Sequence, residues 1–251
     1  MTEVIDDVHT ALTSAGGYLR NVVREQGVTC RVCAAPVKGF ELCWRCRRDG
    51  RIAGLADVVA PLTYVIAGTA SANLLHRYKN HPDRVVREQH SVIVKSVLSL
   101  GITLHERCIA RAVGLPVSLR LVIPSLTCRP GRHPLAELAD QLSVLSEAVA
   151  LVPAPEAMCD RAVNAKFALQ PAVRLNGRHV LIVDDVWTTG SNAQSAALAL
   201  RRAGAAAVSV MVVGRWLNAG HARTAQFISA RLQRPYDPGI CPVSGRRCAE
   251  E

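Results

Sequence analysis

The sequence is poor in aromatic residues and has no long apolar segment. Phe, Trp and Tyr together make up 4% of the 251 residues, although hydrophobic residues reach 49%. The core must therefore be aliphatic, which is typical of helices packed on a buried sheet. No apolar run approaches the roughly 20 residues that a membrane span needs, and the first residues are acidic where a signal peptide would be apolar. We expect a soluble, cytoplasmic protein.

Internal repeats and long low-complexity tracts are also missing, so the length suits one α/β domain with a small appendage. Short β-branched runs alternate with helical patterns from about residue 56 onward. The patterns predict strands at 57–66 (or a hairpin), 120–125, 179–184 and 207–216. They predict helices at 71–80, 83–113 with Gly101 as a candidate break, 135–150, 191–205 and 219–233, and an amphipathic helix at 3–26 that is interrupted or ends near Gly16. This alternation favours a parallel sheet with right-handed crossovers.

The formal net charge is +10, and nearly all of the positive charge is arginine. A basic surplus favours phosphates, nucleic acid or small polyanions as ligands. The alternative is a solvated surface with a few residues that bind one phosphorylated ligand, because most arginines are spread along the chain. The one dense cluster comprises Arg45, Arg47, Arg48 and Arg51.

Four of the nine cysteines form two C-x-x-C pairs within the stretch CRVCAAPVKGFELCWRC. Cys30 and Cys33 are separated from Cys43 and Cys46 by a nine-residue turn. Two such pairs can place four thiolates around one tetrahedral zinc ion, with no open position for chemistry. A structural zinc site is the prediction, and four buried or redox cysteines are the alternative.

The other cysteines carry weaker signals. The odd total and the lack of a secretion signal argue against a disulfide framework. We interpret Cys108 as a buried helix cysteine and Cys128 as an inert thiol beside a basic loop, while Cys159 carries no signal. Cys241 and Cys248 could form a metal half-site, a disulfide or a contact with the ribbon, and plain tail cysteines are the default. The eight histidines show no ligand spacing.

The stretch HVLIVDDVWTTGSN, residues 179–192, has the strongest functional pattern. An apolar strand ends in two adjacent acids, and a loop rich in hydroxyls and glycine then leads into a helix. Ligands of parallel sheets bind at the carboxyl ends of strands, and a helix N-terminus favours an anion. The carboxylates would be tolerated there if they bind hydroxyls, or reach the anion through magnesium. The predicted ligand is a sugar phosphate with a free diol, although two adjacent acids after a strand more commonly cap a helix.

This stretch resembles the phosphoribosyl-pyrophosphate motif of type I phosphoribosyltransferases. With the cysteine ribbon in front, residues 28–215 resemble the ComF family of competence-associated proteins. The resemblance implies the type I phosphoribosyltransferase fold, a Rossmann-like parallel sheet with helices on both faces, behind an N-terminal four-cysteine zinc ribbon. It divides the chain into an N-terminal helix (1–27), the ribbon (28–52), the phosphoribosyltransferase-like domain (53–235) and a cysteine-containing tail (236–251).

The resemblance also assigns roles to individual residues. Asp184 and Asp185 would bind the ribose hydroxyls, and the 5-phosphate would be held by Val186, Thr188, Thr189, Gly190, Ser191 and Asn192. Residues 124–127, with Pro124 and Ser125, would form the pyrophosphate loop. Arg129, Arg132 and His133 would close over the pyrophosphate, and the arginines and aspartates would be catalytic. Lys79 is a candidate phosphate contact or a plain surface lysine.

The implied activity is transfer of phosphoribose from phosphoribosyl pyrophosphate to a nitrogenous acceptor, with magnesium. The alternative is a non-catalytic adaptor in competence and DNA uptake, whose ribbon and arginine cluster contact single-stranded DNA or a helicase. A regulator that senses the sugar phosphate is a third option. The sequence does not determine the acceptor or the oligomeric state, and a homodimer is compatible with it.

Overall fold

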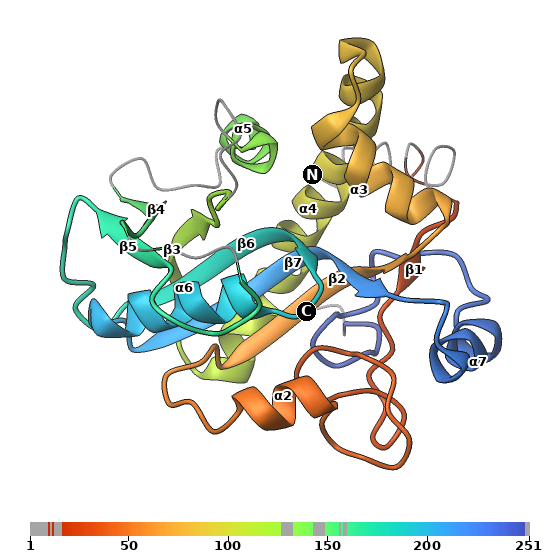
Figure 1. Ribbon diagram of the computed structural model, residues 1–251, viewed down its shortest axis with the longest axis horizontal. Helices are drawn as coiled ribbons and strands as arrows, with labels where there is room; N and C mark the ends of the chain where they lie inside the picture. Colours follow the sequence, from red (N-terminus) through yellow and green to blue (C-terminus); the bar gives the residue numbers. More distant parts are fainter. Residues whose placement is uncertain are drawn as a thin grey trace.

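The computed structural model shows a mixed α/β architecture around a five-stranded, mostly parallel sheet (Figure 1). It describes residues 10, 12, 17–126, 133–142, 149–155, 157 and 160–248. The strand order is β1 (Arg20–Asn21), β2 (Val58–Ile66), β7 (Ala207–Leu217), β6 (His179–Trp187) and β3 (Val117–Val122). Only β1 runs antiparallel to its neighbour in this sheet. The predicted parallel sheet is therefore confirmed.

Helices cover both faces of the sheet. One face carries α3 (Ala70–Asn80), α4 (Arg84–Val113) and α5 (Pro134–Gln141), and the other carries α6 (Ser191–Arg202). Alternate residues of β6 divide between two clusters, because side chains along a strand point to opposite faces. Leu181 and Val183 pack with α3, α4 and α5, while Val180 and Ile182 pack with α6. Two further helices, α2 (Trp44–Asp49) and α7 (Ala222–Arg231), lie outside this sandwich.

The helix predicted at 3–26 does not continue beyond Gly17, which excludes the interrupted form and is compatible with a helix that ends near Gly16-Gly17. Thr10 and Leu12 are helical, but Arg20 and Asn21 form β1 and pair with Tyr64 and Thr63 of β2. The edge of β2 offers unpaired backbone groups, and pairing satisfies them. Long-range pairing thus overrides the local amphipathic pattern.

The helix predicted at 135–150 is also too long. The α5 helix ends at Gln141, and Ala150 begins β4 (Ala150–Pro153), which pairs antiparallel with β5 (Phe167–Gln170). The inward residues Leu151 and Phe167 join the α6 side of the core. Strands of four residues are too short to show a clear period in the sequence, which is why this pair was missed.

Gly101 does not break α4, which runs without interruption for 30 residues. A Cβ atom on Gly101 would lie 2.5 Å from Cδ1 of Leu62 in β2. The glycine therefore lets the helix approach the sheet closely. Within the described ranges, neither α4 nor any other helix is both long and apolar enough to cross a membrane.

Candidate functional site

The two acidic residues lie at the carboxyl edge of the parallel sheet. The strand β6 continues through them to Trp187, past the predicted end at Asp184. Val122 of β3 pairs with Val183, so Pro124 and Ser125 follow at the same edge. Asp184 is half-buried and Asp185 is 2% exposed. The fold thus brings together the acids and the predicted pyrophosphate loop, as far as that loop is described.

Asp185 is held by a network that the sequence only partly indicated. Its Oδ2 accepts a hydrogen bond from the Tyr78 hydroxyl and forms an ion pair with Lys79 Nζ. Tyr78 and Lys79 both lie at the end of α3. His133 Nε2 lies 4.0 Å from the same oxygen. His133 is the N-cap of α5, and its Nδ1 accepts a bond of 3.1 Å from the Leu135 amide, so the ring proton lies on Nε2.

The two carboxyl groups titrate in opposite directions. Burial and the neighbouring Asp185 charge raise the pKa of Asp184 to about 8. Burial also opposes ionisation of Asp185, but the charge of Lys79, the neighbouring His133 ring and the hydrogen bonds from Lys79 and Tyr78 outweigh it and lower its pKa. At neutral pH the pair therefore carries close to one negative charge, which is balanced by Lys79.

This pair does not form a vacant magnesium site. The ammonium of Lys79 already contacts Asp185 Oδ2, where a cation would have to bind. Asp184 Oδ1 accepts a bond of 2.9 Å from the Asp185 amide, and its raised pKa leaves Asp184 largely neutral. Magnesium prefers ionised oxygen ligands in a near-octahedral arrangement, so these side chains do not fit a resident ion.

The loop after β6 is shaped by close packing between Gly190 and Trp187. Gly190 has φ of 79°, and a Cβ atom on it would lie 2.1 Å from Trp187 Cζ2. Gly190 is the N-cap of α6 and provides no side-chain cap. The first-turn amides and the positive end of the helix dipole therefore favour an anion. The Thr189 hydroxyl donates to Ser191 Oγ at 3.2 Å and accepts a long hydrogen bond of 3.4 Å from the Ser191 amide.

Two buried cations that sequence reasoning missed support this loop. Arg215 of β7 donates from Nη1 to the carbonyl oxygens of Trp187 and Thr188, at 2.9 and 3.1 Å. Lys166 is fully buried, and its Nζ lies 3.2 Å from Asn192 Oδ1 in the first turn of α6. An isolated lysine before a short strand gives no signal in the sequence. Lys166 is already paired with Asp160 Oδ1 at 3.0 Å, so among the described residues Arg215 is the cation that brings uncompensated positive charge toward the loop.

Most of the segment predicted to close over the pyrophosphate falls outside the part of the chain that the structure describes. Thr127, Cys128, Arg129 and Arg132 lie outside the described residues. His133, at the end of that segment, faces Asp185. The predicted roles of the two arginines therefore remain predictions.

The four ribbon cysteines form one cluster that is compatible with a zinc site. The sulfur atoms of Cys30, Cys33, Cys43 and Cys46 all lie within 4.8 Å of one another, and Cys33 and Cys43 are 3.8 Å apart. Tetrahedral zinc–sulfur bonds of about 2.3 Å place neighbouring sulfurs about 3.8 Å apart. Hydrogen bonds from the other three thiols lower the pKa of Cys30. The predicted grouping is confirmed, and it packs against the α6 side of the core.

Two aromatic side chains of the ribbon are exposed to solvent, and an arginine guanidinium lies over each ring. Phe40 is 55% exposed and Trp44 is 64% exposed. The guanidinium carbons of Arg47 and Arg48 lie 5.9 and 5.1 Å from the respective ring centroids. Arg45 is largely buried and pairs with Asp49 at 2.9 Å, and the more exposed Arg48 pairs with the same carboxylate at 2.6 Å.

We expect Gly190→Ala to lower the free energy of unfolding by about 2–5 kcal/mol. A left-handed φ costs about 1–2 kcal/mol for a residue with a Cβ atom, and overpacking against Trp187 adds about 1–3 kcal/mol. Gly177→Ala is the matched control, since Gly177 has φ of 76° but nothing within 4 Å of a built Cβ. Urea denaturation should show a loss of only about 1–2 kcal/mol there. Equal losses in both variants would contradict the Trp187 contact.

Asp184→Asn should stabilise the protein at alkaline pH. The folded pKa of about 8 lies above the ordinary value of 3.8. The free energy of unfolding therefore falls as the pH rises from the ordinary pKa toward the folded pKa. The variant loses this penalty, and asparagine can still accept the Asp185 amide. We expect its melting temperature to exceed that of wild type by about 2–4 °C near pH 8.5, corresponding to ~1 kcal/mol, with a smaller gap near pH 5.

Asp185→Asn provides the contrast. Its lowered pKa means that the Asp185 carboxylate contributes stability above the ordinary pKa, and that this contribution is lost in acid. We expect this variant to melt below wild type at pH 7, because Lys79 loses its partner. An Asp184→Asn variant that melts below wild type at every pH would show that the raised pKa is wrong.

Known proteins do not assign this site. No family model matches the sequence, and no curated protein matches it either. What the site can do must therefore be judged from its side chains: a neutral and a charged carboxyl group, a lysine, and a helix N-terminus whose N-cap glycine provides no side-chain cap, at one edge of a parallel sheet.

Proposed function

We propose that the chain is a phosphoribosyltransferase-like protein that binds phosphoribosyl pyrophosphate at the carboxyl edge of β6 and transfers phosphoribose to a nitrogenous acceptor. The observation that carries this proposal is the juxtaposition of Asp184 and Asp185 with the N-terminus of α6, where Gly190 provides no side-chain cap. A ligand that contacts both must carry hydroxyl groups at one end and an anionic group at the other. A ribose phosphate has this pattern.

The 5-phosphate would bind where the loop enters α6. The amides of the first helical turn and the Thr189 and Ser191 hydroxyls supply donors, and Gly190 keeps the backbone open to close approach. Lys166, which is paired with Asp160, holds the Asn192 side chain in the first turn of the helix. Together these groups favour a dianionic phosphate over a neutral group.

The ribose hydroxyls would bind Asp184 and Asp185, and Lys79 would move from Asp185 to the pyrophosphate. In the free protein Lys79 neutralises Asp185. When the ligand enters, we propose that Lys79 turns to the pyrophosphate and that Asp185 accepts bonds from the ribose hydroxyls. Departure of pyrophosphate from the ribose carbon C1 builds up negative charge on the leaving group. A cation placed beside it stabilises that transition state without any nucleophilic side chain. No resident magnesium ion is included in this proposal.

Calorimetric titration of phosphoribosyl pyrophosphate into the full chain, with and without magnesium in solution, tests the proposal. Wild type should bind saturably, and Asp184→Asn/Asp185→Asn should bind about tenfold more weakly or not at all, because hydrogen bonds to charged groups contribute about 1.5–3 kcal/mol. Asp57→Asn removes a carboxylate at the opposite edge of the sheet, before β2, and should bind like wild type. Absence of binding to folded, zinc-loaded wild-type protein would refute the proposal.

A second candidate function, binding of single-stranded nucleic acid by the ribbon, is favoured by its exposed aromatic residues. Single-strand binding surfaces combine aromatic rings, on which bases stack, with cations that contact the backbone. Phe40 and Trp44, with Arg47 and Arg48 over their rings, offer both components on one face. This proposal corresponds to the adaptor alternative and does not require turnover at the β6 edge.

Binding of a labelled single-stranded oligonucleotide, followed by anisotropy over a range of salt concentrations, distinguishes this function. Phe40→Ala/Trp44→Ala should weaken binding about tenfold or more, since each stacked base contributes about 1–3 kcal/mol. Val85→Ala/Val92→Ala is the matched control, because these exposed apolar residues lie on α4. Equal losses in the two double variants, or no binding at low salt, would exclude the ribbon surface.

A further inference from the structure

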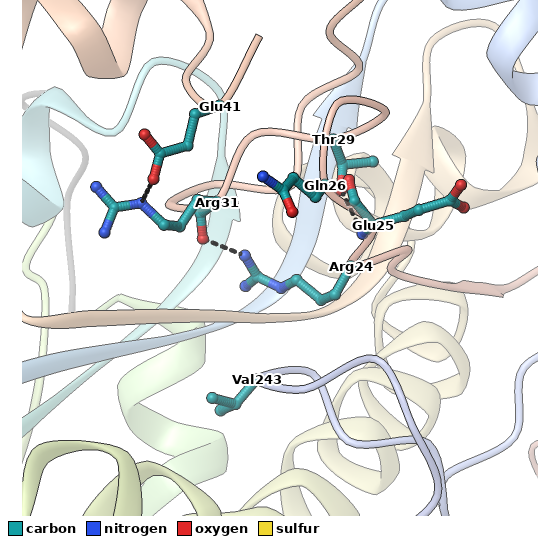
Figure 2. A pocket seen from close by; sticks show the side chains of 7 residues that line it. All are labelled: Arg24, Glu25, Gln26, Thr29, Arg31, Glu41 and Val243. Carbon is teal, nitrogen blue, oxygen red and sulfur yellow. Dashed lines mark hydrogen bonds and ion pairs between the residues drawn. The ribbon is translucent and has the colours of Figure 1, made fainter. Parts of the chain in front are cut away.

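The C-terminal segment is attached to the rest of the protein although it lacks regular secondary structure. Asn21 of β1 exchanges two hydrogen bonds with the Asp237 backbone, at 2.7 and 2.8 Å. The guanidinium of Arg24 donates to the Pro242 carbonyl and to the Arg31 carbonyl, each at 2.8 Å. An open hollow of about 400 Å³ lies here, and Figure 2 shows Arg24 with the ribbon on one side and Val243 of the tail on the other. The tail thus has a defined place against the ribbon.

Two cysteines of this tail meet a histidine and a cysteine of α4. His105 and Cys108 are three residues apart, so they lie on the same face of the helix. The ligand atoms of His105, Cys108, Cys241 and Cys248 all lie within 4.8 Å of one another. This grouping corrects two sequence interpretations, because Cys108 is half-buried rather than buried, and one histidine lies in a group that could hold a metal ion.

The distances within this group suit a tetrahedral metal ion. Cys108 Sγ and Cys248 Sγ are 3.4 Å apart, and Cys248 Sγ lies 3.5 Å from His105 Nδ1. Zinc bonds of about 2.3 Å to sulfur and about 2.0–2.1 Å to nitrogen imply edges of about 3.8 and 3.6 Å. His105 and Cys241 are buried, and Cys108 and Cys248 are half-buried.

The other ring nitrogen of His105 has the partner that a metal-bound histidine requires. His105 Nε2 lies 2.7 Å from the Pro238 carbonyl oxygen, which can only accept a hydrogen bond. The proton is therefore on Nε2, and Nδ1, which faces the cysteines, keeps its lone pair free for a metal. Such an outer partner is the usual companion of a metal-ligating histidine.

The turn that begins at Cys30 in the ribbon shows the backbone geometry of a metal-binding turn, and the tail can be compared with it. The Cys30 amide donates to the Ala35 carbonyl at 2.7 Å, and the Ala34 amide donates to the Cys30 carbonyl at 2.9 Å. Ala34 has φ of 56°. Thr29 and Pro36 form an isolated antiparallel bridge around this turn.

The tail repeats this turn position by position. The Cys241 amide donates to the Arg246 carbonyl, and the Gly245 amide donates to the Cys241 carbonyl, both at 2.8 Å. Gly245 has φ of 73°. Ile240 and Arg247 form the equivalent bridge.

One side chain differs between the two turns. Ser244 stands where the first turn has its second cysteine, Cys33. The ligand that Ser244 does not provide is available from Cys248.

We propose that His105, Cys108, Cys241 and Cys248 bind a second zinc ion, which fixes the C-terminal tail onto α4. The site has four protein ligands, so its role is structural. The tail contributes few buried apolar side chains, and a metal ion supplies the attachment that such a segment cannot obtain from a core of its own.

The metal content of the full chain, purified under reducing conditions, is the first test. We expect two zinc ions per chain by mass spectrometry of the metals, one for each four-ligand group. His105→Ala should lower this by one ion. His90→Ala is the matched control, because His90 lies on the same helix outside the group, and it should retain both ions.

Zinc K-edge absorption on wild-type protein provides a readout that does not depend on how variants fold. One four-sulfur site and one three-sulfur, one-nitrogen site average to about 3.5 sulfur ligands per zinc, whereas the ribbon site alone gives about four. A content of one zinc ion per chain with purely sulfur coordination would overturn the proposal. A disulfide between Cys108 and Cys248 in the reduced preparation would overturn it as well.

Discussion

The burial of β6 on both faces is the constraint on which the candidate site depends. Its neighbours β7 and β3 satisfy its backbone, and apolar side chains cover both of its faces. Charged residues can enter such a strand only at its end, where the edge of the sheet opens. Asp184 and Asp185 therefore occupy the position at which parallel sheets bind ligands, and the loop that follows must turn sharply into α6.

That position has an electrostatic cost, which the protein reduces in two ways. Two adjacent carboxylates in a half-buried site repel each other, so Asp184 tends to stay protonated while Lys79 balances Asp185. The free protein is thus held near neutrality at the edge where a charged ligand would bind. Binding sites commonly retain groups that are suboptimal for stability, and the pKa of Asp184 is the measurable sign of this here.

The segments outside the sheet depend on a different principle. Neither the ribbon nor the tail has enough apolar surface for an independent core, and segments of this size usually need metal ions or cross-links. The equivalent turns at Cys30 and Cys241 support our proposal that a metal ion stabilises the tail as well as the ribbon. Arg24 joins the two turns through backbone carbonyls, so the ribbon, β1 and the tail form one continuous assembly.

The sequence by itself determined the alternation of strands and helices, the place of the acids and the hydroxyl loop, and the four ribbon cysteines, because each depends on local spacing. It failed where partners are distant along the chain. The edge of β2 decided that Arg20 and Asn21 form a strand. Tertiary packing alone brought Lys79 to Asp185, Lys166 to Asn192, and His105 to Cys241. Such contacts join residues dozens to more than a hundred positions apart, and local periodicity carries no information about which distant side chains will meet.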